Sequence, residues 1–413
     1  MKRSFLTFLP IMAALLLVAS CSKDDDTNTV TNNEQTNAEP APVEVVAQPE
    51  YVKIPFSVKV DNGAKLSKIS YSGSDASITR AFEDSEAGNL AMSVTGDGIE
   101  SGSTLTLKKD GDNFIFEGEI SVESGKEEAF TTTGIDLTGT FGTALTAAAT
   151  STISLIDLMQ TCNHEYKATF QSNTTDAIVI YDQNAYFCFS LAETQTKFQL
   201  TIGSGEPQDF TPDATSHKIW IAVAGGTTVK GNLVSTSGLT TVASKIYNAN
   251  RTDVVDLGPT FSVLWKTTNE TGGTVSSSYS QPDAETSVYK DEKYYNWADA
   301  CAFGRINESD EYEKGTADPF RLPTKAELEA LGSGTWKTKN SVNGREFSTD
   351  YGSVFFPAAG LDGGDYAGNE GYCWSGESYD DNGAYLLGFY DGYAYVSPGG
   401  VYFECSVRLV RGL

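Results

Sequence analysis

The feature that most restricts the fold is a regular alternation of apolar and polar residues that begins abruptly at Val52. Every second residue from Val52 to Val60 is apolar, and the residues between them are polar apart from Pro55. Successive side chains of a strand point to opposite faces, so this pattern predicts a strand with one buried face. Because proline has no N–H to donate, we expect the strand to lie at a sheet edge or to contain a bulge.

Similar runs recur further along the chain, with Gly, Asn, Asp or Pro between them. They cover residues 105–107, 114–122, 167–170, 177–181, 186–191, 197–202, 218–223 and 229–234. Such spacing favours antiparallel sandwiches in which each sheet buries one face. We therefore predict a mostly β chain, with one β-sandwich over 51–150 and a second over 160–252. A short helix at 153–159 is expected to connect them.

The charge balance excludes one large class of function. The chain has 29 Lys and Arg residues against 55 Asp and Glu residues, a net charge of −26 at pH 7. Binding to nucleic acid requires clustered positive charge, so no nucleic-acid partner is expected. With two histidines and four methionines, the chain also has few candidates for a histidine-based triad or a His-rich metal site. The composition favours an extracellular, non-catalytic β-protein.

The first residues carry the pattern of an export signal. Lys2 and Arg3 precede an apolar stretch at 5–19, which is too short to span a bilayer comfortably. The small residues before Cys21 resemble the lipobox of bacterial lipoproteins. This resemblance implies that 1–20 is a signal peptide and that Cys21 becomes the acylated mature N-terminus, anchored to a membrane. The alternative is an ordinary cleavage site with a free cysteine nearby.

The acidic segment 22–26 is similar to the export tag that directs lipoproteins of Bacteroides-type bacteria to the outer face of the outer membrane. Without that resemblance it is a solvated run of charge. The following residues are Thr, Asn, Glu, Pro and Ala with almost no bulky apolar side chain, so 21–50 is predicted to be a flexible tether. In an exported protein Cys162 and Cys188 could form a disulfide, which the sequence leaves open.

Residues 50–252 resemble the fimbrillin family, the subunits of protease-activated pili. The resemblance rests on the two successive sandwiches, the Thr79-Arg80-Ala81 segment, and the segments 218–223 and 245–247. It implies that cleavage after Arg80 removes an N-terminal strand and opens a groove for a neighbouring subunit's donor strand. Donor strands bind through an exposed sheet edge, so other pilus subunits are the expected partners. The alternative is that Arg80 is an ordinary loop arginine.

Residues 254–413 carry a different set of motifs, rich in Trp, Tyr, Gly and Asp. Thr324 and Glu327 form a capping box, which predicts a helix at 324–331 that buries Leu328 and Leu331. The ordered motifs at 294–300, 320–328, 354–360, 371–375 and 406–411 resemble the Fibrobacter-type major paralogous domain. That domain is a branch of the formylglycine-generating-enzyme-like group with a C-type-lectin fold. The resemblance implies an α+β domain whose two helices, near 294–303 and 324–331, flank a mostly antiparallel sheet.

The formylglycine-generating-enzyme-like group is named after an oxidising enzyme, but the residues of this module do not favour catalysis. Cys301, Cys373 and Cys405 form no CxxC pair, and no histidine lies in 254–413. The segment 281–283 imitates half of a lectin calcium signature, yet it precedes the first helix and has no Trp-Asn-Asp partner near the end. We therefore predict no enzyme activity, no metal and no cofactor.

The remaining interpretation is a binding surface. Residues 372–403 combine many aromatic side chains with Gly, Ser and Asp, a composition typical of antibody-like binding surfaces. The candidate ligand-binding residues are Trp374, Tyr379, Asp380, Tyr390, Asp391, Tyr393, Tyr395 and Tyr402. The alternative for each tyrosine is that it packs the sheet. A further hypothesis is that a diversity-generating retroelement has altered this stretch, which would also explain Cys373.

These observations give three hypotheses of function. The first is a surface-exposed lipoprotein adhesin, a pilus tip or accessory subunit that binds a host or bacterial surface ligand. A tip position is expected because the lectin-like motif extends to Leu413 and leaves no separate donor strand. The second is a monomeric surface lipoprotein that captures glycans for a nutrient-uptake system. The third is an enzyme of the formylglycine-generating type.

Overall fold

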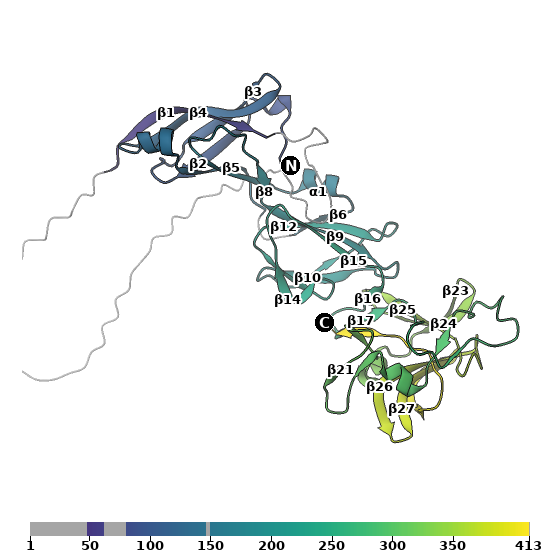
Figure 1. The fold of residues 1–413 in the computed structure, drawn as a ribbon. Coiled ribbons are helices and arrows are strands. Elements are labelled where there is room, and N and C mark those ends of the chain that lie inside the picture. Colours follow the sequence, from purple (N-terminus) through teal and green to yellow (C-terminus); the bar gives the residue numbers. More distant parts are fainter. Residues whose placement is uncertain (1–47, 62–79, 146–148, 413) are drawn as a thin grey trace, which may run out of the picture. The chain divides into compact units, whose positions relative to one another are not determined.

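The computed structural model describes residues 48–61, 80–145 and 149–412. Strands account for 49% and helices for 8% of the structure, so the predicted mostly-β class is confirmed (Figure 1). The signal sequence at 1–20, Cys21 and nearly all of the tether lie outside the described residues. None of the helices in the described ranges has the length and apolar character that a membrane crossing requires.

The first module is a seven-stranded antiparallel sheet with the order β1-β4-β3-β2-β5-β7-β8. The strands are β1 (Tyr51–Val60), β2 (Ala91–Gly96), β3 (Thr104–Asp110), β4 (Asn113–Glu123), β5 (Asp136–Gly142), β7 (Glu165–Gln171) and β8 (Tyr181–Asp182). β1 lies at the edge and pairs with β4, with Pro55 opposite Glu119. The edge position expected from Pro55 is confirmed.

The sheet curls until its two edges meet. A parallel bridge joins Val60 to Ile178, just before β8, and the Ile178 N–H donates to the Lys59 carbonyl at 2.8 Å. One continuous core fills the inside, and it includes Phe82, Phe116 and Ile120. The predicted pair of stacked sheets is therefore replaced here by one rolled sheet. Alternation identifies the buried face, but that face can be covered either by a second sheet or by the sheet itself.

The predicted boundary between the first two domains, at 150 to 160, is wrong. β7 and β8 lie beyond it and belong to the first sheet, where β7 pairs with β5. β6 (Thr150–Thr152) lies where the first domain was predicted to end, yet it pairs with β12 of the second module. Sequence spacing shows where a strand is, whereas its hydrogen-bond partner depends on contacts that are distant in sequence.

The second module has two four-stranded sheets, β11-β10-β13-β14 and β15-β9-β12-β6. The strands are β9 (Asn184–Leu191), β10 (Phe198–Ile202), β11 (Gln208–Phe210), β12 (Lys218–Ala224), β13 (Thr228–Gly231), β14 (Ser235–Thr240) and β15 (Ile246–Arg251). A core that includes Phe187, Phe189, Leu200 and Ile221 draws residues from both sheets. β15 pairs with β9 in parallel, which departs from the expected antiparallel pattern.

The helix predicted at 153–159 is present as α1 (Leu155–Thr161). The Ser154 hydroxyl caps its first turn by accepting a hydrogen bond from the Asp157 N–H at 3.1 Å. Leu158 is buried against Tyr186 and Ala222 of the second module. This packing places the C-terminal end of α1, at Cys162, above β9.

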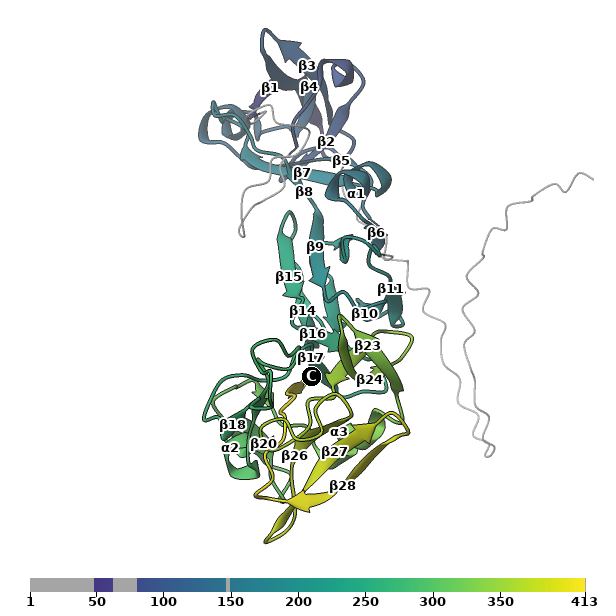
Figure 2. The same ribbon diagram turned by 90° about the vertical axis from the view of Figure 1, so that its right-hand side faces the viewer.

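The C-terminal module is built from short strands and two short helices (Figure 2). The strands are β16 (Val254–Asp256), β17 (Val263–Lys266), β18 (Ser277–Ser278), β19 (Lys293–Tyr294), β20 (Gly304–Ile306), β21 (Tyr312–Lys314), β22 (Phe320–Arg321), β23 (Thr335–Lys339), β24 (Val342–Ser348), β25 (Ser353–Pro357), β26 (Glu370–Asp380), β27 (Gly383–Tyr390), β28 (Ala394–Gly400) and β29 (Val410–Gly412). The largest sheet has the order β16-β17-β29-β22, so the first and last strands of the module lie in one sheet.

Both helices of this module lie where the sequence predicts them. α2 (Trp297–Cys301) is shorter than the expected 294–303, and α3 (Lys325–Ala330) begins after Thr324. The capping box is formed: the Thr324 hydroxyl accepts from the Glu327 N–H at 3.2 Å, and the Glu327 carboxylate accepts from the Thr324 N–H at 2.8 Å. Leu328 and Leu331 are buried as predicted.

Replacing Thr324 by alanine is expected to lower the free energy of unfolding of the C-terminal module by about 1 kcal/mol, because one N–H at the start of α3 loses its acceptor. Urea unfolding followed by tryptophan fluorescence measures this change. Glu329→Ala is the matched control in the same helix, since its exposed ion pair with Lys325 contributes little. Equal effects of the two substitutions would contradict the role of the cap.

Candidate ligand-binding surface

The predicted binding residues lie mainly on the three-stranded meander β26-β27-β28. One face of this meander packs Cys373, Leu387 and Phe389 into one core. The opposite face packs Trp374 and Leu386 into another. Because both faces are covered, the aromatic side chains of this stretch can reach solvent only near the turns that end the strands.

Trp374 is not a ligand-binding residue, so this prediction is wrong. Its side chain is fully buried, and its indole N–H donates to the Tyr295 carbonyl at 2.7 Å. Buried indoles commonly pair their N–H in this way. Cys373 is buried beside it, so the hypothesis of surface diversification does not explain this cysteine.

One group of predicted residues lies at the β26–β27 turn, and we call it the Tyr379 end: Tyr379, Asp380 and Tyr402. Tyr402 reaches this turn because the Val401 N–H donates to the Asn382 carbonyl at 3.0 Å. Tyr379 and Tyr402 are 57% and 74% exposed. The Tyr379 ring packs edge-on against Tyr385, with 5.6 Å between ring centroids.

The other group lies at the β27–β28 turn, and we call it the Tyr390 end: Tyr390, Asp391, Tyr393 and Tyr395. Its three rings form a contiguous set. The centroids of Tyr390 and Tyr393 are 4.8 Å apart, and those of Tyr393 and Tyr395 are 5.4 Å apart. Tyr393 is half exposed, Tyr390 is exposed, and Tyr395 is partly buried.

A buried arginine fixes the Tyr390 end. The Arg345 guanidinium donates to the carbonyls of Tyr390, at 2.5 Å, and Asp391, at 3.4 Å, and also to the Ser333 carbonyl. Arg345 itself is 4% exposed. Gly388 lets the Tyr395 ring lie close to β27, since a Cβ there would stand 2.6 Å from a ring atom. The turn is therefore held from beneath while its rings face solvent.

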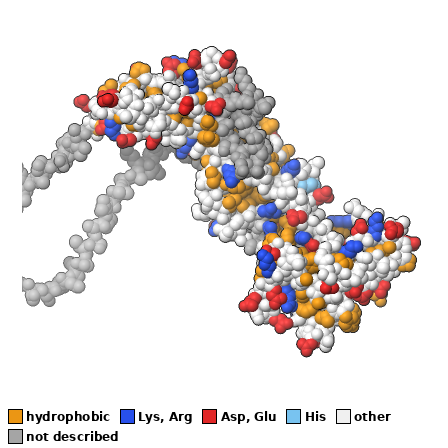
Figure 3. All heavy atoms as spheres, viewed as in Figure 1, with side chains coloured by type: hydrophobic (Ala, Val, Ile, Leu, Met, Phe, Trp, Pro, Cys, Tyr) orange, Lys and Arg blue, Asp and Glu red, His pale blue; other side chains and the backbone are white. Residues whose placement is uncertain are grey.

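The predicted residues form two surfaces rather than one. β27 separates the two turns, and an eight-residue strand extends for about 25 Å. A single small ligand could not contact both ends. The acidic character expected from the composition is visible in Figure 3, where Asp and Glu side chains are spread over the face shown rather than gathered in one patch.

Arg80, the candidate cleavage site, lies against the first module. Its side chain forms an ion pair with Glu86 and stacks on the rings of Phe82 and Tyr166, at 5.1 and 5.3 Å. Its backbone N–H donates to the Ile180 carbonyl at 2.8 Å. A protease needs an extended accessible backbone, so cleavage here would require the segment to open locally. The preceding residues 62–79 lie outside the described ranges.

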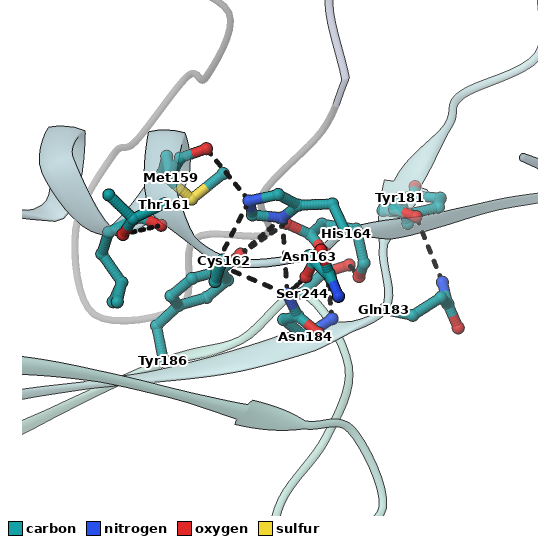
Figure 4. Close-up of polar contacts among 12 residues, drawn as sticks. Met159, Thr161, Cys162, Asn163, His164, Tyr181, Gln183, Asn184, Tyr186 and Ser244 are labelled. Atoms are coloured by element: carbon teal, nitrogen blue, oxygen red, sulfur yellow. Dashed lines mark hydrogen bonds and ion pairs between the residues drawn. The ribbon is translucent and has the colours of Figure 1, made fainter. Parts of the chain in front are cut away.

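All five cysteines of the described ranges are free. The disulfide between Cys162 and Cys188, which the sequence left open, is therefore not formed. The Cys162 sulfur instead lies 3.2 Å from His164 Nε2 (Figure 4). His164 Nδ1 lies 2.8 Å from the Asp182 carboxylate. The sequence analysis missed this cluster. Its one local signal is a Cys-x-His spacing in a chain with two histidines.

No set of three His, Cys, Asp or Glu side chains in the described part of the chain is placed to hold a metal ion. The chain has no match among protein-family models, curated proteins or solved structures.

Proposed function

We propose that the protein is a non-catalytic, surface-exposed lipoprotein adhesin that binds its ligand through the Tyr390 end of the C-terminal module. The observation that carries this proposal is the contiguous set of Tyr390, Tyr393 and Tyr395 on a turn held by buried Arg345. Rigid tyrosines supply contact area at a low cost in conformational entropy, and a fixed turn keeps that cost low.

The lipobox-like segment before Cys21 and the acidic tag at 22–26 support an outward-facing position on the outer membrane, with the lipid as anchor. The pairing of β17 with β29, which joins the beginning and end of the C-terminal module, together with α2 and α3, supports a lectin-like α+β head.

The edge position of β1 supports assembly into a pilus as a tip or accessory subunit. β1 pairs with β4 over ten residues, and Val58 and Val60 are buried in the core. Release of this strand would expose the edge of β4 together with the core beneath it. A donor strand from another subunit could then replace β1 by pairing with that edge.

The proposal is tested by probing an array of glycans and host surface proteins with the full chain. Tyr393→Ala is expected to weaken binding to any ligand found by about tenfold or more, because exposed aromatic anchors contribute most to such interfaces. Tyr312→Ala is the matched control, since Tyr312 is 44% exposed in the same module but lies outside both turns. Equal losses in the two variants, or loss only in Tyr402→Ala, would contradict the assignment to the Tyr390 end. A ligand confined to glycans would favour the nutrient-capture alternative.

A further inference from the structure

We propose that Cys162 is a nucleophilic thiolate, held beside the imidazolium of His164 and oriented through Asp182, and that it exchanges with disulfide-bearing molecules to form a mixed disulfide. The proposal is independent of ligand binding at the Tyr390 end. It assigns a covalent attachment site to the region where α1 ends and β7, β8 and β9 meet (Figure 4).

The oxygen nearest to each ring nitrogen of His164 can only accept a hydrogen bond, while the Tyr186 hydroxyl and the Asn184 amide lie further from Nδ1, at 3.2 and 3.4 Å. Nδ1 lies 2.8 Å from the Asp182 carboxylate, and Nε2 lies 3.0 Å from the Met159 carbonyl. A neutral imidazole carries one N–H and could satisfy one of these acceptors, whereas an imidazolium satisfies both. These two short contacts favour the charged ring. The Nε2 proton also faces the Cys162 sulfur at 3.2 Å, which favours the thiolate as a further acceptor.

Hydrogen bonds hold the Asp182 carboxylate in place. The Asp182 side chain is fully buried, and it accepts hydrogen bonds from the Asn184 N–H at 3.0 Å and from the Tyr186 hydroxyl. The register of β7 and β8 places Asp182 opposite Tyr166, two residues after His164, and this pairing brings the carboxylate to the ring.

The groups that surround the His164 ring are compatible with a protonated, positively charged imidazolium. Burial lowers the pKa of His164, but the hydrogen bonds to Asp182 and Cys162 outweigh it and raise the pKa to about 10. Tyr166 stacks on the ring at 5.7 Å, and burial raises the pKa of both Tyr166 and Tyr186, so both phenols stay neutral. The Arg80 guanidinium lies over the Tyr166 ring and forms an ion pair with Glu86.

The chemistry needs no added oxidant. The thiolate of Cys162 attacks one sulfur of the incoming disulfide, a new S–S bond forms, and the old S–S bond breaks with its electron pair on the departing sulfur. The Nε2 proton of His164 can pass to that leaving thiolate. Acyl transfer is less well supported, because the Cys162 N–H already donates to the Leu158 carbonyl at 3.1 Å and cannot stabilise an oxyanion.

The experiment compares mixed-disulfide formation at individual cysteines of the full chain, with glutathione disulfide as probe at pH 6.5. Acid-quenched samples are digested, and each cysteine is quantified by mass spectrometry. Cys162 is expected to react at least about tenfold faster than Cys188, which is similarly part-exposed but has burial raising its pKa and no histidine partner. Equal rates at the two cysteines would overturn the proposal.

Two variants test the role of the ring. His164→Gln is expected to slow mixed-disulfide formation at Cys162 by about tenfold. His217→Gln, which removes the only other histidine, should leave that rate unchanged. An unchanged rate in His164→Gln would overturn the proposal. If that variant fails to fold, the pH dependence of the wild-type protein decides. Between pH 5.5 and 8.5 the rate of mixed-disulfide formation at Cys162 should vary by no more than about threefold. The rate at Cys188 should rise about tenfold for each pH unit. Parallel profiles would overturn the proposal.

Discussion

Replacing Arg408 by alanine is expected to lower the free energy of unfolding of the C-terminal module by about 3–5 kcal/mol. Arg408 is almost fully buried. Its guanidinium donates to Asn269 Oδ1 at 2.9 Å and to the carbonyls of Lys266 and Phe355, each at 3.0 Å. Truncation would leave these buried acceptors without partners, and each such loss costs about 1–3 kcal/mol.

The charge of Arg408 has no direct carboxylate partner in the described contacts. It reaches Glu292 through Asn269, whose amide donates to the Glu292 carboxylate at 3.2 Å. The guanidinium also lies over the Phe356 ring at 4.6 Å. Burial lowers the pKa of Arg408 to about 10, which leaves it charged at neutral pH. Packing and hydrogen bonding therefore both contribute to its effect.

Two further variants separate these contributions. Arg408→Met keeps most of the side-chain volume and should cost less than Arg408→Ala, because the cavity is smaller while the unpaired acceptors are the same. Arg411→Ala, on the next strand and partly exposed, should change stability by less than about 1 kcal/mol. Urea unfolding followed by tryptophan fluorescence measures all three. A loss in Arg408→Ala no larger than that in Arg411→Ala would show that the buried network does not stabilise the module.

The parts of the fold that were predictable depend on neighbours in sequence. The alternation from Val52 to Val60 predicted β1, and Pro55 predicted its edge position. Thr324 and Glu327 predicted the start of α3. In each case the residues that form the interaction lie within a few positions of one another, so the local pattern contains the cause of the structure.

Strand partners and the burial of whole faces were not predictable in this way. Alternation shows which residues share a face, but it cannot show whether the opposite face is also covered. Trp374 was predicted to be exposed, yet the meander that carries it has a core on each side. Arg408 shows the opposite error. Because its neighbours Val407 and Leu409 are apolar and buried, alternation would expose the Arg408 side chain to solvent, yet that side chain is buried as well.

The cluster of Cys162, His164 and Asp182 depends on one contact that is local in sequence and on one that depends on strand pairing. The spacing between Cys162 and His164 is local and could have been noticed. Asp182 comes eighteen residues after His164 and is brought to the ring by the pairing of β7 with β8. All three residues lie in the predicted second domain at 160–252, but the sequence pattern does not specify which strands pair, so it could not bring Asp182 to the ring.

Loss of the pair between His164 and Asp182 is expected to remove up to about 5 kcal/mol of local stability, and this contribution should depend on pH. The pKa of His164 is raised from an ordinary value of 6.5 to about 10 in the folded protein. Below pH 6.5 the folded and unfolded states are both protonated, and the contribution is fully present. As pH rises from 6.5 towards 10, the unfolded state releases the proton first, so the contribution is progressively lost.

The measurement is hydrogen exchange of the β9 amides, corrected for intrinsic rates, in wild type and His164→Gln at pH 6 and pH 9.5. Taking the difference in protection between wild type and His164→Gln removes the pH-dependent contributions of the other titrating groups, because these are the same in both proteins. The titratable groups that contact the His164 ring are Asp182 on β8, Tyr186 on β9, Tyr166 on β7 and Cys162 at the end of α1. The difference in protection should be large at pH 6 and small at pH 9.5, whereas His217→Gln should show no such trend. A difference that stays constant or grows with pH would mean that His164 is neutral in the folded protein, and the pair would then have no special stabilising role.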